Sequence, residues 1–336
     1  MRNFIFLITV LSIASCTQPC VQEKCLPLSY FQPQDTGILN GGIRMIPITT
    51  PKGNFKVWTK RIGNHPKIKL LLLHGGPGTG HEYFECMESF LPQEGIEFIY
   101  YDQLGTCNSD KPTDTSLWDL SRSVDELEQV RQALHLDSSN LYLLGHSWGG
   151  ILAMEYALKY QQHLKGLIIS DMMSDARAYG KYADEVLSKK LPATVLDTIR
   201  AIEHRKDFSN PQYMELLMPH FYEKFICRIP LEQWPEPVNR AFAKLNQQQY
   251  VIMQGPSEFG ISGKLENWDR SNDLKQIKVR TLIIGATYDT MDPAHMEWMS
   301  KQISGALFHL CPNGSHMCMW DDQQSYFKGL IDFLKS

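Results

Sequence analysis

From about residue 55, the chain alternates short, continuously apolar runs with stretches whose apolar residues recur at helical spacing. Strands without a polar face are typical of sheets buried on both sides, and the connecting helices supply the cover. The pattern therefore predicts an α/β fold with a mostly parallel central sheet. The predicted strands are 55–61, 68–73, 97–101, 141–144, 167–170, 281–285 and 306–310, and the clearest predicted helices are 121–135 and 150–160.

The alternation stops between residues 172 and 268, where the sequence becomes helical and rich in aromatic residues and proline. A block of this size between strands of one sheet predicts an inserted helical cap. We interpret most of its aromatic side chains, among them Tyr179, Tyr222 and Tyr250, as the core of the cap itself. The sheet domain then has two pieces, 38–171 and 269–336, on either side of the cap at 172–268.

The N-terminus predicts export and a lipid anchor. Residues 4–14 form an apolar run that is too short to span a bilayer but suits a signal peptide, so 1–15 are assigned to the signal. The following Ile-Ala-Ser-Cys, ending at Cys16, resembles the bacterial lipobox, in which the cysteine is lipidated. We therefore expect a membrane-anchored bacterial lipoprotein, periplasmic or on the cell surface, with 16–37 as a tether. In such a compartment Cys20 and Cys25 could close a small loop, but their pairing stays open.

Composition narrows the function classes. The 336 residues include 33 Lys and Arg against 37 Asp and Glu, a net charge of −4. This balance lacks the basic surface of a nucleic-acid binder, and 43% hydrophobic residues argue against disorder. Cys311, His316 and Cys318 match no usual zinc pattern, so we predict neither a metal nor a cofactor. Contact with a membrane is expected only through the lipid anchor, and the oligomeric state is left open.

A nucleophile is predicted at Ser147. The sequence GHSWG at 145–149 fits G-x-S-x-G and lies between a predicted strand and a predicted helix. Glycines on such a tight turn leave room beside a strained nucleophile. The N-terminus of the following helix also favours negative charge at this position.

A serine hydroxyl needs a base and an orienting acid, which on this type of turn follow in the order Ser, Asp or Glu, His. Asp289 is the predicted acid because it lies just past the strand 281–285, and open α/β sheets place function at strand ends. Asp292 is explained as a helix N-cap before Pro293.

His316 is the predicted general base because it lies in a loop after the last predicted strand. His295 and His309 also follow the acid, but they fall on a predicted helix and a predicted strand, which suggests packing or surface roles.

The sequence HGGPG at 74–78 follows a predicted strand and corresponds to the loop that contributes one donor to an oxyanion hole. The predicted donors are the backbone amides of Gly76 and Trp148. The phosphate-binding patterns G-x-G-x-x-G and G-x-x-x-x-G-K-[ST] are absent from this loop.

Together these motifs resemble the proline iminopeptidase family of capped α/β-hydrolases, over roughly residues 38–335. The chain is also similar to an archaeal relative, the tricorn-interacting aminopeptidase. The blocks that carry the resemblance are HGGPG at 74–78 with HEYFE at 81–85, YDQLG at 101–105, GHSWGG at 145–150, QGPSEF at 254–259, YD at 288–289 and GSHM at 314–317.

The resemblance implies a serine hydrolase whose triad falls on Ser147, Asp289 and His316, with Glu258 binding the substrate ammonium. A carboxylate at that place would give binding energy only to substrates with a free N-terminus. A second glutamate directly follows the acid in the archaeal relative, whereas this chain has Thr290, and Glu203 in the cap is a weak candidate for that role.

The expected activity is removal of the N-terminal residue, preferentially proline, from short peptides through an acyl-enzyme. An amino-acid amidase or esterase with the same triad and lid is the nearest alternative. A noncatalytic surface-binding lipoprotein is an alternative of another class. Many relatives carry glycine where this chain has Cys107, and the sequence does not show what that difference changes.

Overall fold

The structure is a computed structural model and describes residues 42–336. The predicted signal at 1–15, the tether at 16–37 and three cysteines therefore lie outside the described residues. These cysteines are Cys16, Cys20 and Cys25.

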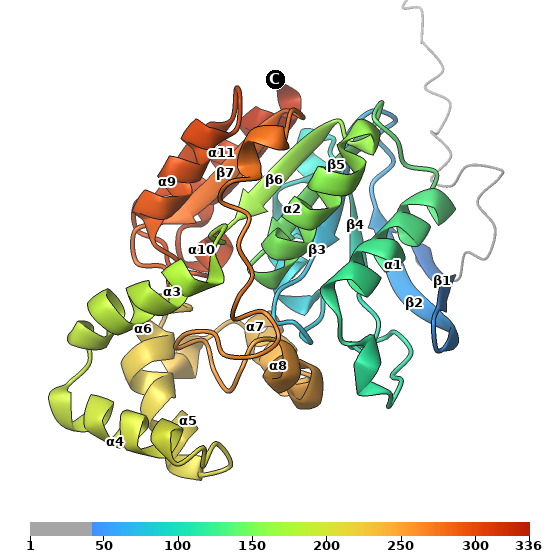
Figure 1. Ribbon diagram of the computed structural model, residues 1–336. Coiled ribbons are helices and arrows are strands. Elements are labelled where there is room, and N and C mark those ends of the chain that lie inside the picture. The colour runs from blue at the N-terminus through green and yellow to red at the C-terminus, as the bar shows by residue number, and fades with distance from the viewer. Residues whose placement is uncertain (1–41) are drawn as a thin grey trace, which may run out of the picture.

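A mostly parallel sheet forms the centre of the molecule, as predicted (Figure 1). Its strand order is β1-β2-β4-β3-β5-β6-β7-β8, with β1 and β2 antiparallel to their neighbours and all other pairs parallel. The strands are β1 (Ile43–Thr50), β2 (Gly53–Ile62), β3 (Lys69–Leu73), β4 (Glu97–Asp102), β5 (Leu141–His146), β6 (Gly166–Ser170), β7 (Thr281–Ala286) and β8 (Leu307–Cys311).

The prediction missed β1, which pairs with β2 at the edge of the sheet. Its sequence IRMIPITT mixes polar and apolar residues, and only two of its residues are buried. An edge strand of this kind lacks the continuous apolar run on which the prediction relied.

Helices cover both faces of the sheet, and alternate residues of each strand enter different layers. Leu71 and Leu73 of β3 belong to a core with α1, α2 and α9, whereas Leu70 and Leu72 belong to a core with α11. The helices outside the inserted segment are α1 (Leu120–Ala133), α2 (Trp148–Tyr160), α9 (Pro293–Gln302), α10 (Cys318–Asp321) and α11 (Gln323–Lys335).

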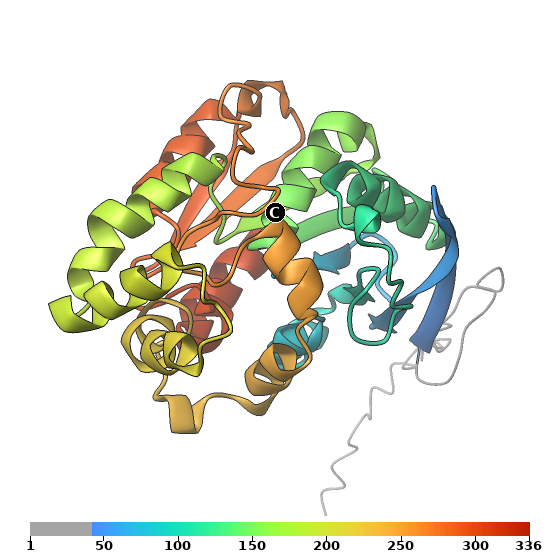
Figure 2. The same cartoon turned by 60° about the horizontal axis from the view of Figure 1, so that its bottom comes forward.

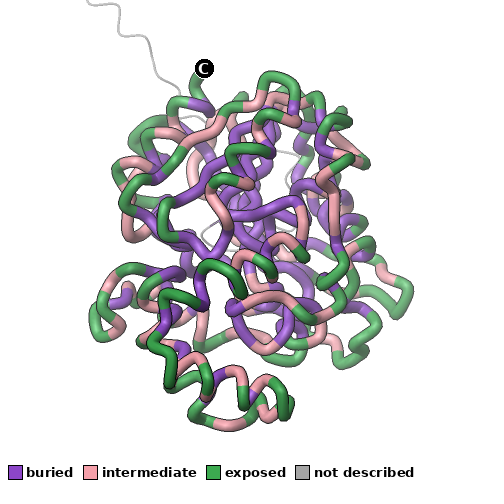
Figure 3. The backbone as a smooth tube through the Cα atoms, turned by 60° about the vertical axis from the view of Figure 1, so that its left-hand side comes forward, coloured by how far each residue is buried: buried purple, intermediate pink, exposed green. Residues whose placement is uncertain are grey.

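Between β6 and β7 the chain forms a group of helices, which we call the cap (Figures 1 and 2). Buried residues concentrate in the sheet, and many residues of the outer cap helices are exposed (Figure 3). No helix in the described part of the chain combines the length and apolar character needed to cross a bilayer. The cap helices are α3 (Ala176–Tyr182), α4 (Ala193–His204), α5 (Pro211–Leu217), α6 (Glu223–Phe225), α7 (Glu236–Ala243) and α8 (Gln247–Met253).

The cap is attached to the sheet domain through α7 and the 3₁₀ helix η2 (Glu82–Ser89) that follows the HGGPG loop. Arg240 forms a two-bond ion pair with Glu85, at 2.9 and 2.8 Å. Lys244 Nζ lies 2.8 Å from Glu82 Oε1. These contacts place the cap over the ends of the parallel strands, where the predicted site residues lie.

Candidate active site

Ser147 occupies a strained turn between β5 and α2. Its backbone angles, φ 56° and ψ −127°, lie in a region that side-chain-bearing residues rarely adopt. A Cβ on Gly149 would meet the Leu73 carbonyl oxygen at 2.0 Å, and one on Gly145 would meet the Gly149 carbonyl oxygen at 2.0 Å. The turn can therefore form only with glycine at both positions.

His316 is oriented by Asp289. Its Nδ1 lies 2.7 Å from Asp289 Oδ1, and both side chains are buried. Burial alone would lower the pKa of His316, but the charge and hydrogen bond of Asp289, together with the charge of Glu258, raise it above 6.5. The Nδ1 bond leaves Nε2 as the ring atom available for proton transfer with a hydroxyl.

Thr290, the residue that follows Asp289, contacts Asp289 and does not line the pocket. Thr290 Oγ1 donates to Asp289 Oδ1 at 3.2 Å and lies 3.4 Å from His316 Nδ1. Its hydroxyl is buried and is not part of the pocket lining. The side chain that replaces the second glutamate of the archaeal relative thus contacts the acid–base pair.

Two backbone amides lie free beside the nucleophile. Gly76 lines the same pocket as Ser147, and Trp148 is the first residue of α2, where helix N–H groups have no intrahelical acceptor. Within residues 42–336, neither amide donates to another residue. Gly75 is different, because its N–H donates to the Tyr83 hydroxyl oxygen at 2.5 Å.

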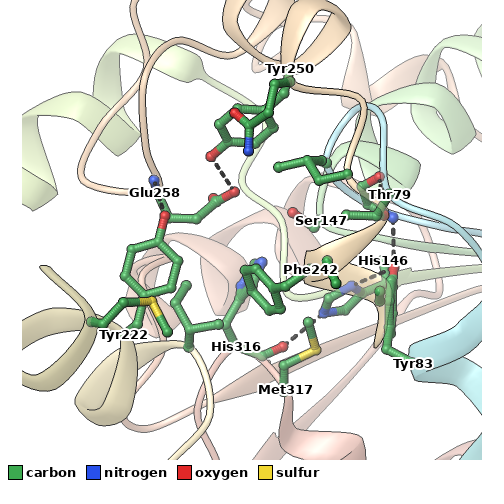
Figure 4. Close-up of a pocket in the computed structure, with 18 of the residues that line it drawn as sticks. Thr79, Tyr83, His146, Ser147, Tyr222, Phe242, Tyr250, Glu258, His316 and Met317 are labelled. Carbon is green, nitrogen blue, oxygen red and sulfur yellow. Dashed lines mark hydrogen bonds between the residues drawn. The ribbon is translucent and has the colours of Figure 1, made fainter. Parts of the chain in front are cut away.

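Glu258 is buried, and three tyrosines form hydrogen bonds with its side chain or main chain. Figure 4 shows two of them, Tyr222 and Tyr250, beside it. Tyr250 donates to Glu258 Oε1 at 2.6 Å, Tyr179 donates to its backbone carbonyl at 2.5 Å, and its backbone N–H donates to Tyr222 Oη at 3.1 Å. Burial raises the pKa of Glu258, while His316 and the Tyr250 hydrogen bond oppose that rise. Sequence reasoning assigned these tyrosines to cap packing and missed their hydroxyl contacts, which no local pattern reveals.

Glu203 does not line the pocket. Its carboxylate accepts from Arg200 at 2.7 Å and from Tyr213 at 2.9 Å. The Tyr213 hydroxyl also lies 2.9 Å from Ser257 Oγ, so Glu203 sits behind the segment that carries Glu258. Within residues 42–336 the Glu203 carboxylate contacts Arg200 and Tyr213 outside the cavity lining, and its ammonium-binding role stays a prediction.

The other residues singled out in the sequence have structural explanations. Asp292 caps α9 by accepting from the Ala294 N–H at 2.9 Å. His295 contacts Ser174 at 2.9 Å, and His309 on β8 lies 2.8 Å from the Ser325 carbonyl oxygen. Cys107 has a φ of 30°, a left-handed conformation that favours glycine.

Gly76, Ser147, Glu258 and His316 line one cavity of about 360 Å³ between the cap and the sheet domain. Figure 4 shows Glu258 on one side of Ser147, and His146 and Tyr83 on the other. The walls of the cavity are mainly apolar, and Glu258 is the one carboxylate among the described residues that line the cavity. The apolar lining includes Met214, Met218, Ile226, Phe242, Leu245 and Met317. The arrangement places a serine, a histidine and a carboxylate around one cavity.

A family model described as the alpha/beta hydrolase fold matches residues 69–323, and the chain belongs to this class of enzymes. It is 58% identical to the proline iminopeptidase of Chitinophaga pinensis over 291 residues, which are 87% of this chain and 97% of that protein. It is also 58% identical to the proline iminopeptidase of Elizabethkingia meningoseptica, over 87% of this chain and 97% of the relative. Within the α/β hydrolases, the chain belongs to the proline iminopeptidase family.

A solved structure agrees with this assignment. The proline iminopeptidase of Mycobacterium smegmatis superposes with a TM-score of 0.73 at 26% identity, covering 86% of this chain and 97% of that chain. The similarity therefore includes the cap as well as the sheet domain.

Proposed function

We propose that the protein is a serine exopeptidase that removes the N-terminal residue, preferentially proline, from short peptides. The observation that carries the proposal is the placement of the Glu258 carboxylate in the same cavity as Ser147 and His316. An anionic group buried close to a nucleophile selects substrates whose cationic N-terminus lies next to the scissile bond. The apolar walls suit a pyrrolidine ring.

The reaction follows from these roles. Ser147 Oγ attacks the carbonyl carbon of the first residue while His316 takes its proton, and Asp289 holds the imidazole in the required tautomer. The amides of Gly76 and Trp148 stabilise the negative oxygen of the tetrahedral intermediate. His316 then protonates the leaving amine, and an acyl-enzyme remains. Water activated by His316 hydrolyses the ester and releases the free amino acid.

The test compares proline p-nitroanilide with its N-acetylated form on purified protein. We expect turnover of the free amine, little turnover of the acetylated compound, and a kcat lowered by several orders of magnitude in Ser147→Ala. Equal cleavage of both substrates would exclude an exopeptidase but leave a hydrolase. Undiminished turnover in Ser147→Ala would exclude the mechanism.

Two further comparisons define the substrate. A dipeptide with N-terminal proline should be cleaved in preference to prolinamide, because the leaving group of a peptidase substrate is a second residue. A panel of free aminoacyl arylamides should show the highest kcat/KM for proline. A clear preference for prolinamide over the dipeptide would instead support the alternative of an amidase or esterase.

We also propose that the protein is exported and anchored by a lipid on Cys16. The support is the apolar run at 4–14 followed directly by the lipobox-like residues. Metabolic labelling with a fatty acid should mark the wild-type protein and not Cys16→Ser. Equal labelling of both proteins would overturn the assignment.

A further inference from the structure

Tyr83 and His146 connect three segments of the active site through a chain of buried hydrogen bonds. Tyr83, on η2, accepts from the Gly75 N–H at 2.5 Å, and its hydroxyl lies 3.1 Å from His146 Nδ1. His146 Nε2 lies 2.7 Å from the backbone carbonyl oxygen of His316. Both side chains are only 1% exposed, so water does not compete for these bonds.

The donors and acceptors in this chain are determined by chemistry. A carbonyl oxygen only accepts, so His146 carries a proton on Nε2 and donates it to His316. Burial, together with the neighbouring His316, holds the pKa of His146 well below 6.5, so the ring is neutral and its Nδ1 accepts. The Tyr83 hydroxyl must then donate to Nδ1 while its oxygen accepts from Gly75. Only one placement of the protons gives every donor and acceptor in this series of hydrogen bonds a partner.

This series of hydrogen bonds connects the oxyanion loop, the nucleophile turn and the His316 loop, whose relative positions determine the geometry of the site. Gly75 precedes Gly76, the predicted oxyanion donor, and a Cβ on Gly75 would lie 2.9 Å from Ser147 Cβ. His146 directly precedes the nucleophile, and the carbonyl it holds belongs to the residue predicted to be the base. Because Tyr83 occupies the Gly75 amide, the neighbouring Gly76 amide is the one left for an oxyanion.

We propose that Tyr83 and His146 are positioning residues, which hold the oxyanion loop and the main chain of His316 in register with Ser147. This inference rests on the proposed function. In this role the two side chains act through Gly76 and His316 and do not touch the substrate's ammonium. Their loss should therefore weaken stabilisation of the tetrahedral intermediate and leave ground-state binding nearly unchanged.

Tyr83→Phe is the sharpest variant, because it removes one oxygen and keeps the ring packed against Phe84 and His146. Tyr156→Phe is its matched control. The Tyr156 hydroxyl is also buried and donates to a carboxylate, Glu128 Oε2, at 2.7 Å, but it lies outside the pocket lining. Both variants lose one buried tyrosine hydroxyl, and only one of them interrupts the chain.

The first readout separates kcat from KM on proline p-nitroanilide. We expect Tyr83→Phe to lower kcat by about 10- to 100-fold with KM within about threefold of wild type, since small misplacements at a reacting centre are this costly. Tyr156→Phe should retain wild-type kcat. A kcat for Tyr83→Phe within twofold of wild type, or an equal loss in Tyr156→Phe, would overturn the proposal.

The second readout uses prolyl boronic acid, which forms a tetrahedral adduct with an active serine, and free proline, which does not. Tyr83→Phe should weaken boronic acid inhibition by a factor similar to its loss in kcat and leave proline inhibition unchanged. Equal weakening of both inhibitors would overturn the proposal. His146→Gln, which keeps a donor and an acceptor, should retain more activity than His146→Leu, and equal losses would also contradict it.

The proposed function and the positioning role can fail separately. Wild-type turnover of proline p-nitroanilide tests the former. The latter is also tested by the rate at which a fluorophosphonate labels Ser147, which requires no proline substrate. Slower labelling of Tyr83→Phe than of Tyr156→Phe supports the positioning role, and equal rates overturn it.

Discussion

At the scale of single residues, Glu258 combines burial with an unused oxygen. Tyr250 donates to Oε1, while Oε2 accepts no hydrogen bond from any residue in 42–336. A buried carboxylate that is only partly satisfied binds a cation strongly, because the charge is poorly solvated before binding. If Glu258 binds the substrate ammonium, as proposed, this one carboxylate would act without the second glutamate of the archaeal relative, whose position is Thr290 here.

Glu258→Gln keeps the shape of the side chain and removes its charge. We expect kcat/KM for proline p-nitroanilide to fall by about 10- to 100-fold, as hydrogen bonds to charged groups contribute about 1.5–3 kcal/mol. Tyr250→Phe keeps the charge and should cost less than about tenfold. Steady-state kinetics of the three proteins provide the measurement. A wild-type kcat/KM in Glu258→Gln would contradict the role of this carboxylate.

The pH dependence of kcat/KM should reflect the raised pKa of His316. The imidazole must be neutral to accept the serine proton, so activity declines as pH falls through that pKa. Because the pKa is raised from 6.5, the midpoint of the acid limb should lie above 6.5. Glu258 contributes to the rise, so the midpoint should move down in Glu258→Gln. A wild-type midpoint at or below 6.5, from a kcat/KM profile, would refute this expectation.

At the scale of elements, the conformation of the β5–α2 turn depends on a few neighbouring residues. Ser147 adopts a positive φ, and the glycines at 145 and 149 allow the turn to approach β3 closely. The backbone strain is held by the sheet, since the Ser147 N–H donates to the Ser170 carbonyl at 3.0 Å. Short-range chemistry of this kind is readable from sequence because neighbouring residues impose it.

Gly149→Ala should destabilise the fold, whereas Gly180→Ala should not. The new methyl group at 149 would meet a β3 carbonyl oxygen at 2.0 Å, and overpacking of this kind costs about 1–3 kcal/mol or more. Gly180 lies inside α3 with nothing within 4 Å of an added Cβ, so alanine there should stabilise by about 0.5–1 kcal/mol. Urea unfolding followed by circular dichroism measures both, and equal effects would count against this account.

At the scale of the whole molecule, the cap lines one side of the cavity and also contacts the loops that carry the predicted catalytic residues. The His316 N–H donates to the Phe225 carbonyl of α6 at 3.0 Å, and Arg240 and Lys244 reach η2. Burial would raise the pKa of Glu82, but hydrogen bonds from Lys244 and other groups lower it to about 2. The cap is therefore joined to the sheet domain on the side of the oxyanion loop and on the side of the histidine.

Breaking the cap-to-sheet ion pair should loosen α7. Glu85→Gln weakens the bidentate pair with Arg240, whereas Glu236→Gln removes only a pair within α7. Ion pairs at this level of exposure contribute up to about 1 kcal/mol, so hydrogen exchange of α7 amides should accelerate by about two- to fivefold in Glu85→Gln. Equal acceleration in Glu236→Gln would show that the link to η2 does not hold the helix.

The sequence by itself determined the parallel sheet, the order of the functional residues and the family. Continuous apolar runs, glycines at a strained turn and a histidine in a loop after the last strand are local signals, imposed by residues a few positions apart. The edge strand β1 was not predicted, because its residues mix polar and apolar character.

Only the tertiary structure decided which partners these residues meet. Tyr83 reaches His146 across 63 positions, and His146 reaches the His316 carbonyl across 170. The packing of the cap brings Tyr179, Tyr222 and Tyr250 into hydrogen bonds with Glu258. It also pairs Glu203 with Arg200, outside the cavity. Such contacts depend on how distant segments pack, and a sequence pattern records only what neighbouring residues impose on the backbone.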